Sequence, residues 1–132
     1  VFGNSQYRHG DALPAAARDA ALMANALRGR GYHVLLARDR TLAGMKEDIG
    51  VFTELSENAD VRVIYFAGHG FEFGHDNYLM PVDLPSPITE LDERLVGLHA
   101  LRLQEVAWPM EQELSMDVKG RGYCEGTQPL AP

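Results

Sequence analysis

Residues 61–70 constrain the fold of this chain more than any other segment. They read VRVIYFAGHG, an apolar and β-branched run that ends abruptly in Gly68-His69-Gly70. Such a run is typical of a buried strand in a parallel sheet. His69 would then lie at the carboxyl end of the strand, where open α/β sheets place their active sites. The two glycines allow the backbone to approach a substrate closely, and they leave the Gly70 N–H available as a donor.

An alternative interpretation of His69 is structural. A histidine in a turn between a strand and a loop can simply satisfy its own hydrogen bonds there. The spacing of the residues around His69 does not separate this alternative from a catalytic role.

The segment before residue 61 has the periodicity of alternating strands and helices. Pro14 can begin a helix, because the missing N–H costs nothing in the first turn. An apolar stripe follows at helical spacing, formed by Ala16, Ala20, Met23 and Leu27. Residues 32–37 are predicted to be the second strand.

A second helix is predicted after Thr41, a residue type that caps helix N-termini through its hydroxyl. Its apolar stripe is Leu42, Met45, Ile49 and Phe52. The order strand, helix, strand, helix, strand predicts an α/β fold, with a mainly parallel sheet covered on both faces as a three-layer αβα sandwich. After His69, residues 71–73 and 78–80 are predicted to form a hairpin around a turn at residues 74–77.

Composition limits the partners that we expect. The chain has 132 residues and a net charge of −7, which argues against nucleic acid or an anionic membrane surface as a partner. The sequence has no apolar run long enough to span a bilayer. Its single cysteine excludes an internal disulfide and fits a reducing, cytoplasmic location. Residues 1–4 read like the end of a strand already under way, so we expect the N-terminus of the domain to be missing.

The motif YFAGHG at residues 65–70, followed by NYLMPVD at residues 77–83, resembles the histidine-bearing p20-type part of the caspase-like cysteine peptidases, peptidase family C14. The similarity is greatest to the bacterial and metacaspase branch. It extends upstream through GNSQY at residues 3–7 and through Asp19-Ala20 in the first helix, about 80 residues in order. The resemblance implies a caspase-like fold, incomplete here at both ends, and hydrolysis of peptide bonds in peptide or protein substrates by a Cys–His dyad.

The resemblance also implies roles for two matched residues. His69 would be the general acid and base that protonates the leaving amine. The backbone N–H of Gly70 would be a donor of the oxyanion hole.

Cys124 is the one thiol available as a nucleophile. It follows His69 by 124 − 69 = 55 residues, close to the roughly 50 that separate the two residues in caspases. The family places its cysteine directly after a strongly apolar strand, whereas residues 119–123 read KGRGY; the metacaspase-like branch has an aspartate where this chain has Gly122. The alternative is a chain truncated or diverged before the nucleophile strand. We therefore divide the chain into a caspase-like catalytic domain at residues 1–113 and a divergent or disordered tail at residues 114–132.

Asp19 is the candidate for substrate specificity. It matches the aspartate by which metacaspase-like relatives bind a basic side chain, so the resemblance implies cleavage after Arg or Lys. The alternative is a carboxylate that only favours the helix dipole. No cofactor is predicted and no residues have convincing metal spacing, although the resemblance to metacaspases, which are often activated by calcium, makes calcium activation an open alternative. A catalytically inactive caspase-like module, acting as a scaffold or regulatory partner, is the competing function.

Overall fold

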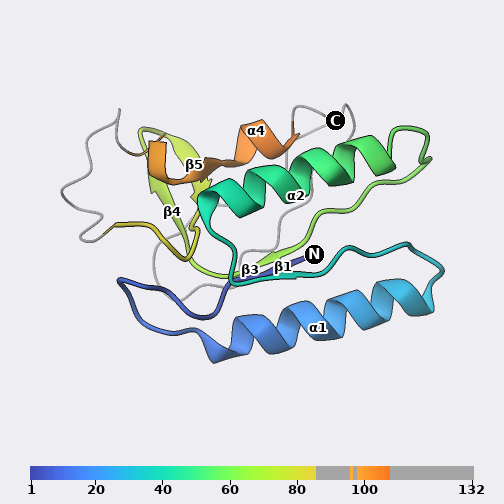
Figure 1. Cartoon of the computed structure of the whole chain (residues 1–132), viewed down its shortest axis with the longest axis horizontal. Helices are drawn as coiled ribbons and strands as arrows, with labels where there is room; N and C mark the ends of the chain where they lie inside the picture. Colours follow the sequence, from blue (N-terminus) through green and yellow to red (C-terminus); the bar gives the residue numbers. More distant parts are fainter. Residues whose placement is uncertain (86–95, 97, 108–132) are drawn as a thin grey trace.

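The computed structural model in Figure 1 describes residues 1–85, 96 and 98–107. Its first part alternates strands and helices: β1 (Phe2–Gly3), α1 (Pro14–Gly29), β2 (Ala37–Arg38), α2 (Leu42–Leu55) and β3 (Phe66–Ala67). The three strands form a parallel sheet in the order β2-β1-β3. Helices α1 and α2 lie on opposite sides of this sheet (Figure 1). The α/β class and the parallel pairing are thus as the sequence predicts.

Helix α1 packs unusually close to β1. A Cβ placed on Gly3 would lie 2.6 Å from the Cβ of Ala20, so only glycine fits at this contact. The buried residues of α1 are all alanines: Ala16, Ala20 and Ala24. The predicted stripe is right for Ala16 and Ala20 and did not include Ala24. Met23 and Leu27 are half-buried, because the close approach turns the small residues toward the sheet.

Helix α2 follows its sequence prediction. The Thr41 hydroxyl accepts a hydrogen bond from the Gly44 N–H at 3.2 Å and caps the helix. The Asp83 carboxylate accepts a second one from the Leu42 N–H at 2.9 Å. Met45 and Ile49 are buried against Phe2 of β1, on the face opposite α1.

Two strand predictions needed correction. The second strand is Ala37–Arg38 and does not span residues 32–37. The strand before His69 is Phe66–Ala67, and the residues leading into it are not buried: Val61 is 59% exposed and Val63 37%. Among the described residues β3 pairs only with β1, so one of its edges has no partner strand there.

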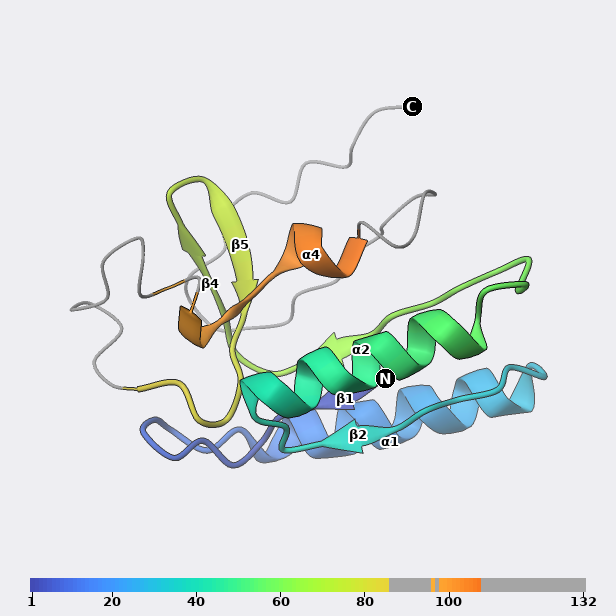
Figure 2. The ribbon, with the colours of Figure 1, turned by 45° about the horizontal axis from the view of Figure 1, so that its top comes forward.

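A second, antiparallel sheet begins immediately after His69. It contains β4 (Gly70–Phe73), β5 (Asp76–Leu79) and β6 (Leu101–Arg102), in the order β4-β5-β6. The predicted hairpin is confirmed; its turn is tighter than expected, with Gly74 and His75 both at positive φ. The hairpin extends away from the parallel sheet, and α4 (Leu103–Ala107) follows β6 (Figure 2). None of the described helices is long and apolar enough to cross a membrane.

Candidate active site

His69 lies where the two sheets meet. The chain leaves the parallel sheet at Ala67 and enters the antiparallel sheet at Gly70, so Gly68 and His69 are the whole connection. This places the histidine at the carboxyl end of β3, as the sequence predicts. The carboxyl ends of β1 and β3 are neighbours, because Gly3 is paired with Ala67. The residues that follow β1 are therefore close to the histidine.

The imidazole of His69 is oriented by a backbone carbonyl. Its Nε2 lies 3.2 Å from the carbonyl oxygen of Asp11, in the loop before α1. A carbonyl oxygen only accepts, so Nε2 carries the hydrogen in this contact. The other ring nitrogen, Nδ1, is then the one that can take up and release a proton.

Tyr7 contacts both the backbone and the ring of His69. The His69 N–H donates to the Tyr7 hydroxyl at 2.7 Å, and the ring centroids lie 4.8 Å apart at an angle of 46°. Burial raises the pKa of Tyr7 to about 12, although the hydrogen bond from the His69 amide acts in the opposite direction. The phenol therefore stays neutral at physiological pH. The sequence included Tyr7 in the family resemblance but suggested no role for it.

The hydrogen-bond pattern of the hairpin sets the direction of the Gly70 N–H. The Met80 N–H donates to the carbonyl of His69 at 3.0 Å, and Gly70 is paired with Leu79. In an antiparallel ladder this makes Gly70 and Leu79 a non-hydrogen-bonded pair. The carbonyl and N–H of one trans peptide point in opposite directions. The Gly70 N–H is therefore directed away from β5.

Gly68 is required by the packing around the histidine. A Cβ at this position would lie 2.7 Å from the Tyr7 hydroxyl and 2.7 Å from Cζ of Phe66. The Tyr7 hydroxyl cannot give way freely, because Tyr7 is buried and bonded to His69. The first glycine of the Gly-His-Gly motif thus makes room for the tyrosine.

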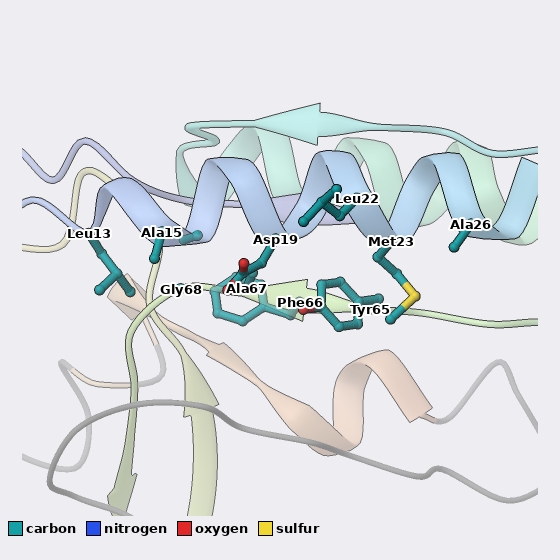
Figure 3. Close-up of a pocket in the computed structure, with 11 residues that line it drawn as sticks. Leu13, Ala15, Asp19, Leu22, Met23, Ala26, Tyr65, Phe66, Ala67 and Gly68 are labelled. Atoms are coloured by element: carbon teal, nitrogen blue, oxygen red, sulfur yellow. The ribbon is translucent and has the colours of Figure 1, made fainter.

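Asp19 lines a cavity of about 380 Å³ between α1 and β3. Figure 3 shows its carboxylate pointing from the helix toward Ala67 and Gly68. Among the described residues that line the cavity, Asp19 alone is charged. The walls are mainly apolar, with Leu13, Leu22, Met23 and Phe66 among them. Since Gly68 is part of the lining, the cavity reaches the residue next to His69.

Cys124 and the predicted tail at residues 114–132 lie outside the described residues, as does the boundary at residue 113. The structure thus brings His69, Gly70 and Asp19 to one region of the sheet edge. Within the described part of the chain, no group of three or more His, Cys, Asp or Glu side chains could hold a metal ion.

An α/β domain with Gly-His-Gly at the end of a parallel strand is the arrangement of the caspase-like peptidases. Residues 1–103 match the family described as caspase domain, peptidase C14, and the chain belongs to this family of cysteine peptidases.

Two mammalian relatives share a matching segment of 87 residues, which is 66% of this chain. One is the mucosa-associated lymphoid tissue lymphoma translocation protein 1 of Homo sapiens, 31% identical. The other is its homolog in Mus musculus, 30% identical. The segment covers only 11% and 10% of these two proteins. The match therefore concerns one domain of much longer chains.

Proposed function

We propose that this chain is part of a cysteine endopeptidase that cleaves peptide bonds after Arg or Lys. His69 is its general acid and base, and the Gly70 N–H is an oxyanion donor. Asp19 binds the basic side chain of the substrate, and Cys124 is the nucleophile. The observation that carries the proposal is the position of His69, oriented by Asp11 and next to a cavity with one carboxylate.

The chemistry of such a site runs in two steps. The cysteine thiolate attacks the scissile carbonyl, and the Gly70 N–H stabilises the oxyanion. The protonated Nδ1 of His69 gives its proton to the leaving amine, and a thioester remains. Water then attacks the thioester as His69 takes one of its protons; the carboxylic acid leaves and the thiolate is restored.

The cavity supports a preference for basic side chains. The aliphatic part of an arginine or lysine can pack on the apolar walls, while its charged end meets the Asp19 carboxylate. A guanidinium bonds a carboxylate with two parallel hydrogen bonds, so arginine should be the better substrate. The cavity offers no described cation that would favour an acidic side chain instead.

The test is hydrolysis of fluorogenic peptides ending in Arg, Lys or Asp by the 132-residue chain, with and without calcium. We expect cleavage after Arg and Lys, and its loss in Cys124→Ala and in His69→Ala. Asp19→Asn should raise KM for the basic peptides with a smaller change in kcat, since it removes a binding charge. Circular dichroism and urea unfolding establish that each variant is folded.

The results separate the parts of the proposal. A folded chain that cleaves no peptide contradicts Cys124 as a working nucleophile. Cleavage that persists in Cys124→Ala assigns the chemistry to another group. Cleavage after Arg that is unchanged in Asp19→Asn removes the carboxylate from substrate binding.

A second function is a caspase-like module without catalytic activity. The observation in its favour is the polar, glycine-containing sequence KGRGY at residues 119–123, where the family has an apolar strand before its cysteine. The module would use the fold to bind a protein partner. Absence of hydrolysis, together with a thiol at Cys124 that reacts with iodoacetamide no faster than a free cysteine, is its expected result.

The finer family and cellular assignments belong to the same proposal. They are the bacterial and metacaspase branch, the complete three-layer sandwich, a cytoplasmic location and hydrolysis without a cofactor. The calcium arm of the peptide assay tests the last of these directly.

A further inference from the structure

His69 occupies an irregular position in the β4–β5 ladder. Continuing the register of the hairpin places His69 opposite Met80. In a regular antiparallel ladder, this pair would exchange two hydrogen bonds. Only one is present, from the Met80 N–H to the His69 carbonyl at 3.0 Å.

Two side chains from the segment after β1 take the place of the second bond. The His69 N–H donates to the Tyr7 hydroxyl at 2.7 Å. The Met80 carbonyl accepts from Nδ2 of Asn4 at 3.1 Å. The His69 N–H and the Met80 carbonyl, which would have paired with each other, are therefore both satisfied by the GNSQY segment. The ladder ends at His69.

We propose that Tyr7 is a positioning residue for His69, acting through the backbone of the Gly-His-Gly turn. This inference rests on the proposed function, in which His69 exchanges protons and Gly70 binds the oxyanion. The peptide unit before His69 is held by Tyr7 through its N–H, and the peptide unit after it is held by Met80 through its carbonyl. Anchoring both units sets the two backbone dihedrals of His69, and with them the direction of its side chain.

Tyr7 also restricts the imidazole itself. The rings are 4.8 Å apart, and the Asp11 carbonyl holds Nε2 from another side. Tyr7 is well placed for this task because its own side chain is 9% exposed and its segment is held at both ends. The Leu13 N–H donates to the Ser5 carbonyl, and the Arg8 N–H donates to the Val82 carbonyl.

The test compares Tyr7→Phe with Tyr78→Phe. Both substitutions delete one hydroxyl from a buried tyrosine of the same apolar cluster. The Tyr78 hydroxyl interacts with Arg102 instead of His69, so Tyr78→Phe is the matched control. Urea unfolding first measures how much stability each variant loses.

The decisive readouts are amide hydrogen exchange and the ¹⁵N chemical shifts of the imidazole, both measured by NMR on the full chain. In Tyr7→Phe we expect the protection of the His69 amide to fall about tenfold relative to the Met80 amide. The imidazole shifts of His69 should change as well. Tyr78→Phe should alter neither. Unchanged exchange and imidazole shifts in a folded Tyr7→Phe would overturn the proposal.

A second variant keeps the test decisive if Tyr7→Phe does not fold. Replacement of Tyr7 by 3-fluorotyrosine keeps the hydroxyl but makes it a weaker acceptor, so the His69 amide should lose part of its protection. No loss contradicts the positioning role.

Hydrolysis of the arginine peptide separates this inference from the proposed function. If the wild-type chain is active, Tyr7→Phe should lower kcat with little change in KM, and an unchanged kcat would count against positioning. If the wild-type chain is inactive but the His69 signals respond to Tyr7→Phe, the proposed peptidase activity fails while the positioning contact stands.

Discussion

Asn4 is the residue whose replacement best tests the account of how the two sheets are joined. Its side chain is completely buried. Oδ1 accepts from the Arg40 N–H at 2.9 Å, and Nδ2 donates to the Met80 carbonyl at 3.1 Å. A weaker contact of Nδ2 reaches the Arg40 carbonyl at 3.4 Å. One amide thus links the ends of β1, β2 and β5.

Asn4→Leu keeps a similar volume but leaves the Arg40 N–H and the Met80 carbonyl without a partner. An orphaned buried group costs about 1–3 kcal/mol, so two cost about 2–6 kcal/mol. Burial of the leucine offsets about 1.5 kcal/mol of this. We expect a net loss of about 0.5–4.5 kcal/mol, centred on about 2.5 kcal/mol, which is a large part of the stability of a small domain.

The assay is urea unfolding of the full chain, followed by circular dichroism. Gln6→Leu is the control, because it makes the same kind of change at an exposed side chain two residues away. This control should remain within about 0.5 kcal/mol of the wild type. An Asn4→Leu chain as stable as the control, with an unchanged slope against urea, would refute the hydrogen-bond argument.

Three further substitutions test the close contacts and the electrostatics. Gly3→Ala should destabilise the chain by about 1–3 kcal/mol in urea unfolding, because its Cβ would overlap Ala20 of α1; a neutral result would contradict the tight packing. Gly68→Ala should shift the ring resonances of Tyr7 in NMR spectra, and an unchanged spectrum would contradict the contact with the Tyr7 hydroxyl. Asp39→Asn should make the free energy of unfolding less dependent on pH in acid. Burial raises the pKa of Asp39, but hydrogen bonds from the Ser5 N–H, the Gln6 N–H and the Ser5 hydroxyl outweigh it and hold the pKa below the usual value. The stabilisation is therefore complete above about pH 4 and is lost as pH falls through the lowered pKa. Urea midpoints between pH 7 and pH 2 measure the difference, and parallel curves for the two chains would disprove it.

The helix starts and the hairpin turn were predictable, because residues close together in sequence determine them. Pro14 begins α1 and Thr41 caps α2, because the unpaired N–H groups of a helix terminus select these residue types in any context. The hairpin after His69 was also predictable from local sequence, because turn-forming residues separate two short apolar segments. Its turn residues, Gly74 and His75, take positive φ within an alternating pattern.

The errors concern features that depend on neighbours distant in sequence. The apolar run before β3 predicted burial, but burial needs covering elements on both sides, and Val61 and Val63 are partly exposed in the described part of the chain. The stripe of α1 included Met23 by periodicity. Gly3, on another element, lets Ala20 of the helix pack directly on the strand, and Ala24 is buried in place of Met23.

Only part of the candidate site could be predicted, because some of its residues are distant from His69 in sequence. His69 and Gly70 follow from a continuous motif. The Asp11 carbonyl lies 58 residues from His69 in sequence, and as a backbone group it has no side-chain signature. Tyr7 is 62 residues away, and a tyrosine in a short polar segment looks like an ordinary loop residue.

The junction of two sheets explains why the site depends on a segment so remote from the histidine. A chain that passes from a parallel sheet into an antiparallel hairpin in two residues must end one hydrogen-bond ladder before it begins another. At that point the backbone groups of His69 and Met80 need partners that no strand supplies, and unpaired buried groups would be costly. Asn4 and Tyr7 supply them from the segment that follows the adjacent strand β1. Substitutions of Asn4 and Tyr7 should therefore affect the turn at His69, although neither residue belongs to its motif.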